Sequence, residues 1–214
     1  MNKKILIGSI IAVAILALSS LGVIAFTSEE TPFASSESSM VGNLPRWEEE
    51  IRYYNPDTVG MPIWFDCGNP PCYFISAIRL TQDELSVYSG WNLTKIKVYI
   101  EDIWPPEATF IIYGEGTSTQ PGIIIYEDND VYLEDDGYNI IELKTSIPLD
   151  EHDELWVAIA WEYDITPPIG LDDGPAVPLK GDWVSQTGVS WEELRDGGLD
   201  NNWPIGAIVE GEGT

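Results

Sequence analysis

The chain has 214 residues, with 36 acidic and 10 basic side chains and a formal charge of −26 at pH 7. A polyanion of this size repels nucleic acid and anionic lipid headgroups, so neither is expected as a partner. The acidity has two interpretations, capture of cations such as calcium or solubility in a salty medium. Because the charges are scattered along the chain, solubility is favoured.

The N-terminal residues have the pattern of an export segment. Two lysines precede an uncharged apolar run that covers residues 5–26. Val23 and Ala25 suit signal-peptidase cleavage, whereas the length of the run also suits a retained, membrane-tethering helix of roughly 20 residues. We therefore expect residues 1–26 to form a hydrophobic helix that is either a signal peptide or a membrane anchor. Both alternatives predict a protein that is extracellular or on the outer face of the cytoplasmic membrane.

The rest of the chain divides into a linker and one domain. Residues 27–50 are rich in Ser, Thr and Glu and have no apolar periodicity, which predicts a polar linker. Residues 51–214 have a normal size for a single domain with its own hydrophobic core.

Cys67 and Cys72 are the two cysteines, and four residues separate them in CGNPPC. This spacing differs from the CxxC redox motif, and a zinc site would need further Cys or His ligands. In an exported protein, a disulfide between the two is the expected state.

From residue 73 onward, short apolar or alternating runs are separated by Gly, Pro, Asn and Asp. A capped helical turn is expected at Thr81–Leu85. Leu155–Trp161 is apolar on both faces, which indicates a central strand. The pattern predicts an all-β, antiparallel sandwich. Strands are expected at Tyr73–Leu80, Lys95–Ile100, Thr109–Tyr113, Ile123–Tyr126, Asn139–Leu143, Leu155–Trp161 and Ile205–Val209.

Several stretches resemble a known module. They are AIRLTQDELSVYSGWNLTKIKVY, PGIIIYE, YNIIELKTSIPLDEHDELWVAIAWE, GLDDGPAVPLKGDWVS and GLDNNWPIGAIVEG. In this order they resemble the jelly-roll domains of secreted bacterial and archaeal surface proteins, which are related to the cleaved-adhesin modules of gingipain-type proteases. The resemblance covers Ile51 to Gly211 and implies an antiparallel, jelly-roll-like β-sandwich of about eight strands.

The resemblance also implies a function. Such modules are generally non-catalytic, act in adhesion or stabilise a partner domain, and often bind calcium. Asp172 and Asp173 lie in a Gly-flanked loop that the resemblance marks as a calcium site, and Asp57 lies where these domains often carry an acidic turn. Loop carboxylates are suitable calcium ligands. The alternative is that each Asp caps its own turn.

Trp104, Trp191 and Trp203 lie in loops or at strand ends, where we expect exposure. Exposed aromatic residues mark ligand-binding surfaces when they cluster, so these three are candidates for binding a glycan or protein. The alternative for any Trp is a place in the core. Asn92 begins an Asn-Leu-Thr sequon for N-glycosylation.

Catalysis is not expected. His152 is the one histidine of the chain and lies in the polar segment DEHDE. A nucleophile–histidine pair needs a positioned and partly buried histidine, whereas this one is expected to be solvated. A glycosidase needs two carboxylates, and no pair is singled out among the 36.

These observations predict a secreted or membrane-tethered, non-catalytic β-sandwich that binds a surface ligand, either a protein or a glycan. The alternative is a structural subunit of an extracellular filament or sheath. In that case the chain forms a homo-oligomer, in which the polar N-terminal segment adds a strand to a neighbour. A hydrolase is a third and weaker alternative.

Overall fold

The computed structural model describes residues 46–61, 63, 70–101, 107–129, 131–134, 136–164 and 168–212. The predicted hydrophobic helix at 1–26 lies outside these residues, as do Cys67 and Trp104. Within the described part of the chain, no helix is long and apolar enough to cross a bilayer.

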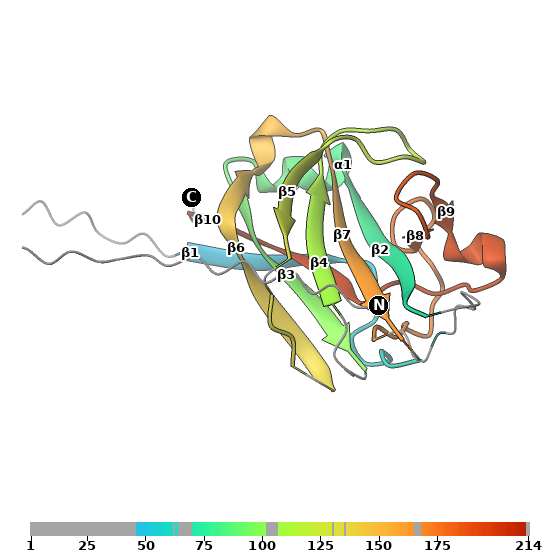
Figure 1. Cartoon of the computed structure of the whole chain (residues 1–214). Coiled ribbons are helices and arrows are strands. Elements are labelled where there is room, and N and C mark those ends of the chain that lie inside the picture. The colour runs from blue at the N-terminus through green and yellow to red at the C-terminus, as the bar shows by residue number, and fades with distance from the viewer. Residues whose placement is uncertain are drawn as a thin grey trace, which may run out of the picture. The chain divides into compact units, whose positions relative to one another are not determined.

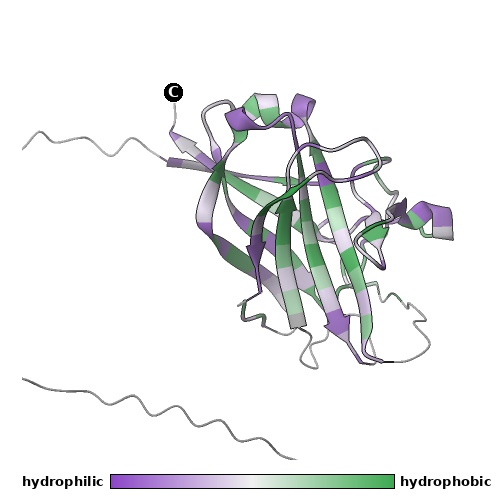
Figure 2. Ribbon diagram, turned by 45° about the horizontal axis from the view of Figure 1, so that its top comes forward, coloured by the Kyte–Doolittle hydropathy of each residue, from purple (hydrophilic) through white to green (hydrophobic). Residues whose placement is uncertain are grey.

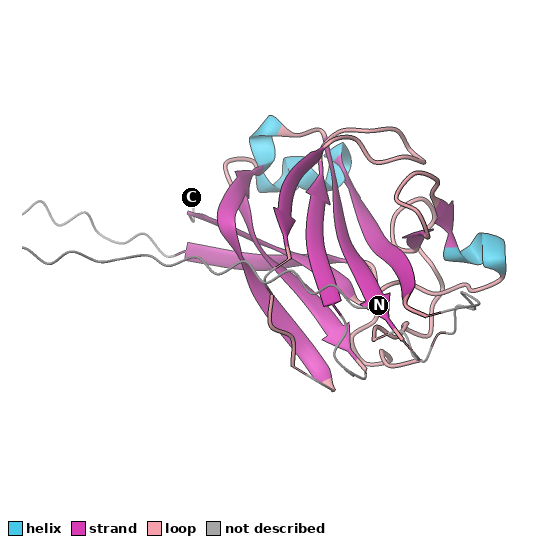
Figure 3. Ribbon diagram, viewed as in Figure 1, coloured by secondary structure: helices cyan, strands magenta, loops and turns pink. Residues whose placement is uncertain are grey.

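The described residues are mostly β-strand, joined by four short helical segments that lie outside the sheets (Figure 3). The helical segments are α1 (Gln82–Leu85), η1 (Ser86–Tyr88), η2 (Leu149–Glu151) and η3 (Leu194–Gly197). The strands are β1 (Arg46–Arg52), β2 (Cys72–Thr81), β3 (Asn92–Ile100), β4 (Glu107–Tyr113), β5 (Ile124–Asp128), β6 (Gly137–Pro148), β7 (Glu154–Tyr163), β8 (Trp183–Ser185), β9 (Glu192–Glu193) and β10 (Ile205–Glu212).

These strands form two antiparallel sheets in a sandwich (Figure 1). The four-stranded sheet has the order β1-β10-β3-β6, and the six-stranded sheet has the order β5-β4-β7-β2-β8-β9. The pairs are nested along the chain: β1 pairs with β10, β2 with β7, β3 with β6, and β4 with β5. The short strands β8 and β9 stand outside this nesting and extend the six-stranded sheet beyond β2.

The main core lies between the two sheets, and β7 shows how the sequence builds it. Successive side chains of a strand point to opposite faces. Leu155, Val157, Ile159 and Trp161 therefore face the main core. Trp156, Ala158 and Ala160 face outward, yet they are buried in a second apolar cluster. Figure 2 shows the hydrophobic character of the central strands of the six-stranded sheet, to which β7 belongs.

The second cluster consists of apolar side chains on the outer face of the six-stranded sheet. Its buried members come from β2, β4, β7 and β8, and Trp191 packs against them. The members are Ile75, Ala77, Ile111, Tyr113, Trp156, Ala158, Ala160 and Trp183. The prediction that Leu155–Trp161 is a central strand is confirmed, because β7 lies between β4 and β2.

Most predicted elements are present. Each of the seven expected strands falls within or overlaps one of β2 to β7 or β10. The expected helical turn is α1, where the Glu84 carboxylate accepts a hydrogen bond from the backbone N–H of Thr81 at 2.8 Å. The described residues form ten strands rather than about eight, because the short strands β8 and β9 have too little apolar sequence to be recognised.

β1 is the main difference from the sequence-based expectation. It begins at Arg46, inside the segment expected to be a polar linker, so the sandwich starts before residue 51. Its sequence RWEEEIR lacks an apolar alternation, but its carboxylates meet lysines across the neighbouring strand. Lys97 Nζ lies 2.9 Å from Glu50 Oε2, and Lys95 pairs with Glu48. Ion pairing on the outer face thus stabilises a strand that hydrophobic patterning does not indicate.

Candidate functional site

The β8–β9 hairpin carries the candidate site. Trp183, Val184 and Ser185 of β8 are buried, and β8 pairs with β2 through the backbone. Just before β8, Asp182 is fully buried and receives two hydrogen bonds of 3.1 Å from the Arg195 guanidinium. Burial raises the pKa of Asp182 to about 6, against the lowering effect of Arg195. The pair fixes the base of the hairpin, because Arg195 lies in η3, directly after β9.

The hairpin loop is held by the hydroxyl groups of Ser185 and Thr187, and Thr187 Oγ1 accepts the N–H of Val189 at 3.2 Å. Ser185 Oγ donates a hydrogen bond to the carbonyl of Ser190 at 2.6 Å. The same oxygen accepts the N–H of Gly188 at 2.8 Å. Gly188 has φ = +74°, a left-handed conformation that favours glycine. The loop therefore has a defined conformation before any ligand binds.

A second loop supports the first from the side. The β4–β5 loop reaches over the end of the six-stranded sheet towards the hairpin (Figure 1). There, Gln120 Nε2 donates a hydrogen bond to the carbonyl of Val189 at 3.1 Å. Gly122 is required in this loop, because a Cβ atom at this position would lie 1.9 Å from the carbonyl oxygen of Glu115.

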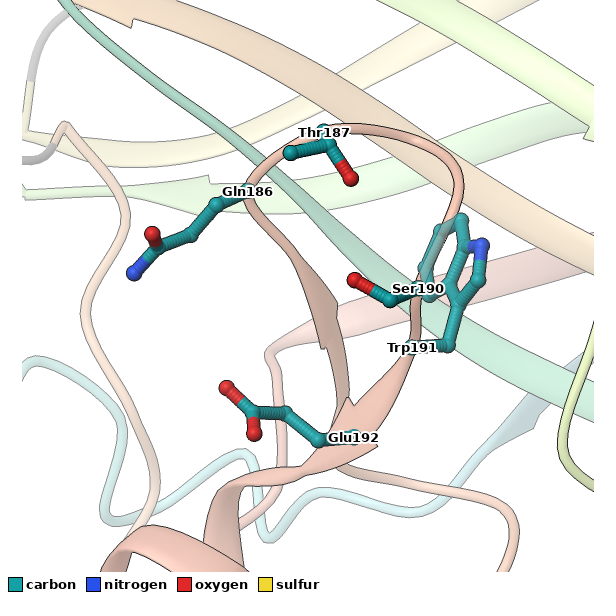
Figure 4. A pocket seen from close by; sticks show the side chains of 5 residues that line it. All are labelled: Gln186, Thr187, Ser190, Trp191 and Glu192. Carbon is teal, nitrogen blue, oxygen red and sulfur yellow. The ribbon is translucent and has the colours of Figure 1, made fainter.

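The hairpin loop forms a pocket of about 200 Å³. Its lining consists of Gln186, Thr187, Ser190, Trp191 and Glu192 (Figure 4). In the close-up, the side chains of Gln186 and Glu192 extend to the same side of the loop. The lining offers an amide, two hydroxyls and a carboxylate next to an aromatic residue. These groups can hold a polar ligand through hydrogen bonds.

Trp191 is half-buried, so its predicted exposure is correct only in part. Its ring contacts Trp156 edge-on, with centroids 5.7 Å apart, and Tyr113 at 6.1 Å. Among the described residues, its indole Nε1 is buried without a hydrogen-bond partner. Burial also raises the pKa of Tyr113 to about 12. Trp191 therefore joins the pocket to the apolar cluster beneath it.

Trp203 was expected to be exposed, and this expectation is wrong. Its side chain is 0 % exposed, stacks near Phe74 and donates a hydrogen bond from Nε1 to the carbonyl of Trp183 at 2.8 Å. It belongs to the main core and cannot form a surface with Trp191. Trp104 lies outside the described residues. Of the three candidate tryptophans, Trp191 is therefore the one that the described residues place at a candidate binding surface.

The structure brings the predicted calcium residues into neighbouring loops. Asp172 is 1 % exposed, and each of its carboxylate oxygens accepts two N–H donors. Oδ1 accepts the backbone N–H groups of Gly174 and Asn202, while Oδ2 accepts the backbone N–H of Asn55 and the Asn202 amide. This arrangement holds three chain segments together, which is the role of a structural carboxylate.

Asp173 and Asp57 are exposed beside this junction. Asp173 Oδ1 accepts the Thr58 hydroxyl at 2.6 Å, and the backbone N–H of Asp57 donates to Asn55 Oδ1 at 3.2 Å. Within the described residues, no group of three or more Asp, Glu, His or Cys side chains could hold a metal. Calcium binding stays a prediction, which a rise in melting temperature beyond that caused by sodium chloride at equal ionic strength would support.

The other predicted residues have clear positions. Cys72 is buried at the start of β2, and the disulfide stays a prediction because Cys67 lies outside the described residues. Asn92 begins β3 and is half-buried, and its glycosylation also stays a prediction. His152 is expected to be solvated, but its side chain is only 16 % exposed and its Nδ1 lies 2.9 Å from Glu115 Oε1. Neither His152 nor Glu115 belongs to the lining of the pocket.

The sequence pattern alone does not indicate Gln186, Thr187, Ser190 and Glu192 as site residues. Each has an ordinary polar side chain, and only the conformation of the loop brings them together. The segment SQTGVSW does contain a Gly turn next to Trp191, a signal for a hairpin loop with an aromatic residue at its base.

Comparisons with known proteins found no relative of this chain. No family model matches the chain, and no curated protein or solved structure matches it either. A proposal about function therefore has to be based on the fold and on the geometry of the pocket.

Proposed function

We propose that this protein is an extracellular, non-catalytic binding module with a jelly-roll fold, whose site is the β8–β9 pocket. Its ligand would be a protein or glycan on a surface, as the sequence led us to expect. The segment at residues 5–26 would export the domain or tether it to the membrane.

The nested strand pairs support the jelly-roll assignment. A jelly roll is a two-sheet sandwich made of two Greek keys. Without β8 and β9, the sheets contain strands in the order first-eighth-third-sixth and second-seventh-fourth-fifth. This order results from rolling up one long antiparallel hairpin, in which the first strand pairs with the last. The resemblance to secreted surface modules is consistent with this arrangement.

The observation that carries the binding role is the position of the pocket on the added hairpin. Function commonly lies in sites added to a common fold. Here the eight nested strands form the framework, and β8 and β9 are an addition that presents a supported polar loop. A pocket of about 200 Å³ is smaller than the roughly 300–1,000 Å³ typical of drug-sized ligands, so it suits one sugar ring or one side chain.

We infer binding rather than catalysis at the pocket. Glu192 is the one ionisable side chain of its lining, which has no histidine, cysteine or lysine. Nucleophilic catalysis by the Ser190 or Thr187 hydroxyl would also need an adjacent general base that activates it. Binding is the function that this set of side chains favours.

A pocket-filling variant tests the proposal. Ser190→Trp would occupy the pocket, and Val87→Trp is the control because Val87 is exposed elsewhere, in η1. Amide NMR spectra of the full chain would be titrated with short peptides and uncharged trisaccharides. We expect a ligand to shift the amide signals of Gln186–Glu192 in the control but not in Ser190→Trp. If both variants bind every probe as the unchanged protein does, the pocket is not the site.

A further inference from the structure

The basic side chains of the described residues all form ion pairs within the chain. Two of the ten, Lys3 and Lys4, lie outside the described residues. The other eight each form at least one ion pair with a carboxylate of the same chain. They are Arg46, Arg52, Arg79, Lys95, Lys97, Lys144, Lys180 and Arg195. The excess carboxylates therefore dominate the field around the molecule.

The basic side chains near the pocket in sequence are also paired with carboxylates of the chain. The basic groups close to it in sequence are Lys180, 2.8 Å from Glu84, and Arg195, which contacts Asp182 and Glu193 at 3.1 and 3.2 Å. Glu192 is exposed at the pocket and forms no ion pair with any described residue. The lining thus contains a carboxylate without a cationic partner and no basic group that could receive an anion.

We propose that the pocket binds the side chain of a lysine or arginine from a basic segment of an extracellular partner protein. This inference rests on the proposed function and specifies its ligand. Glu192 would pair with the cationic group. The side-chain oxygens of Gln186, Ser190 and Thr187 can accept its remaining N–H donors. The volume of about 200 Å³ suits one such side chain.

Charge complementarity favours this occupant over a glycan. The anionic field raises the rate at which a basic segment meets the surface, and it repels acidic or sulfated sugars. A neutral sugar could use the same hydroxyl and amide groups, but it would gain nothing from the unpaired carboxylate. Binding of a neutral sugar is therefore the competing outcome of the test.

The test uses two peptides that differ at one position, acetyl-Gly-Ser-Gly-Lys-Gly-Ser-Gly-amide and the same peptide with Gln in place of Lys, together with maltotriose. The full chain would be compared with Glu192→Gln and with Glu162→Gln. Glu162 is an exposed carboxylate near the end of β7 that does not line the pocket, so its variant removes the same charge without changing the lining. The readout is the dissociation constant from amide shifts of Gln186–Glu192.

We expect the lysine peptide to bind more tightly than the glutamine peptide. Glu192→Gln should weaken its affinity by about 1.5- to 5-fold, the range for one exposed ion pair. Glu162→Gln should leave it unchanged. Equal weakening in both variants would show attraction by the overall charge without a site, and would overturn the inference. No shift with either peptide would also overturn it. If maltotriose alone shifts these amides, the inference fails while the proposed binding function stands.

Discussion

Asp172 and Asn202 are 30 positions apart in the chain and are joined by two hydrogen bonds. The backbone N–H of Asn202 donates to Asp172 Oδ1 at 2.6 Å, and its Nδ2 donates to Oδ2 at 3.0 Å. Asn202 also donates to the carbonyl of Pro175. The two loops that precede β8 and β10 are therefore held together by a buried carboxylate and a buried amide.

Because Asp172 holds this junction together, we expect Asp172→Asn to destabilise the protein much more than Asp173→Asn. Asp172→Asn replaces one acceptor oxygen by an NH₂ group that faces N–H donors. We expect a loss of about 2–4 kcal/mol in the free energy of unfolding, because each buried unsatisfied donor costs about 1–3 kcal/mol. Asp173→Asn is the control and should cost about 1 kcal/mol or less, because Asp173 is exposed. Urea unfolding measures both values. Similar losses would contradict the assigned role of Asp172.

Trp183 supplies the second prediction, which concerns the support of the pocket. Its ring lies 5.1 Å from that of Trp156 and is 2 % exposed. Trp183→Ala should lower the free energy of unfolding by about 3–5 kcal/mol, the usual cost of removing a buried aromatic side chain. Because the cavity would lie under the hairpin, hydrogen exchange should accelerate most at Gln186–Trp191. Tyr132→Ala, at a position that is 87 % exposed, should change neither quantity.

How much of this fold was readable from the sequence depends on how each element is stabilised. β3 alternates apolar and polar residues, and β7 is continuously apolar, so both were recognised. β1 was missed because Glu48 and Glu50 gain their stabilisation from Lys95 and Lys97, which are distant in the chain. Cross-strand partners of this kind cannot be inferred before the strand order is known.

The candidate site was readable to a smaller extent. Trp191 was identified because a tryptophan in a polar loop stands out. Trp203 looked similar in sequence but is buried, since its Nε1 reaches the carbonyl of Trp183. The polar residues of the pocket are brought together by Ser185, whose hydrogen bonds within the loop are a property of the folded conformation.

The third prediction concerns pH. The pKa of Asp182 is raised to about 6 by burial, above the ordinary value of about 3.9, so the folded state holds the proton more tightly than the unfolded chain. The stability that protonation provides is complete below pH 4 and is lost as the pH rises through about 6. Asp182→Asn cannot titrate and lacks this dependence.

The measurement compares this variant with the unchanged protein by urea unfolding at several pH values between about 4 and 7. The difference in unfolding free energy, variant minus unchanged protein, should rise across this range. The rise can reach about 3 kcal/mol, because each pKa unit corresponds to about 1.36 kcal/mol. A difference that stays constant with pH would mean that Asp182 is ionised throughout, held by Arg195.

The last prediction concerns the edge strand β1 and the alternative of a filament. β1 is at the edge of the four-stranded sheet, so a second copy could pair with it. If two copies paired antiparallel around Glu49, this residue would face its own copy, Glu48 would face Glu50 and Arg46 would face Arg52. Like charges directly opposite each other destabilise a pair of strands. The sequence RWEEEIR therefore opposes self-association through this edge.

Removing the charge of Glu49, at the centre of β1, should allow two copies to associate through this strand. Glu49 is exposed and forms no ion pair with a described residue, so Glu49→Val should leave the fold intact. It would place an apolar side chain between Trp47 and Ile51 on an open edge, which favours edge-to-edge pairing. We expect this variant to associate with rising concentration in size-exclusion chromatography with light scattering. Glu162→Val, which changes the interior strand β7, should stay monomeric under the same conditions. If the unchanged protein already associates through β1, as cross-linking at Trp47→Cys would reveal, charge does not protect this edge and the filament alternative gains support.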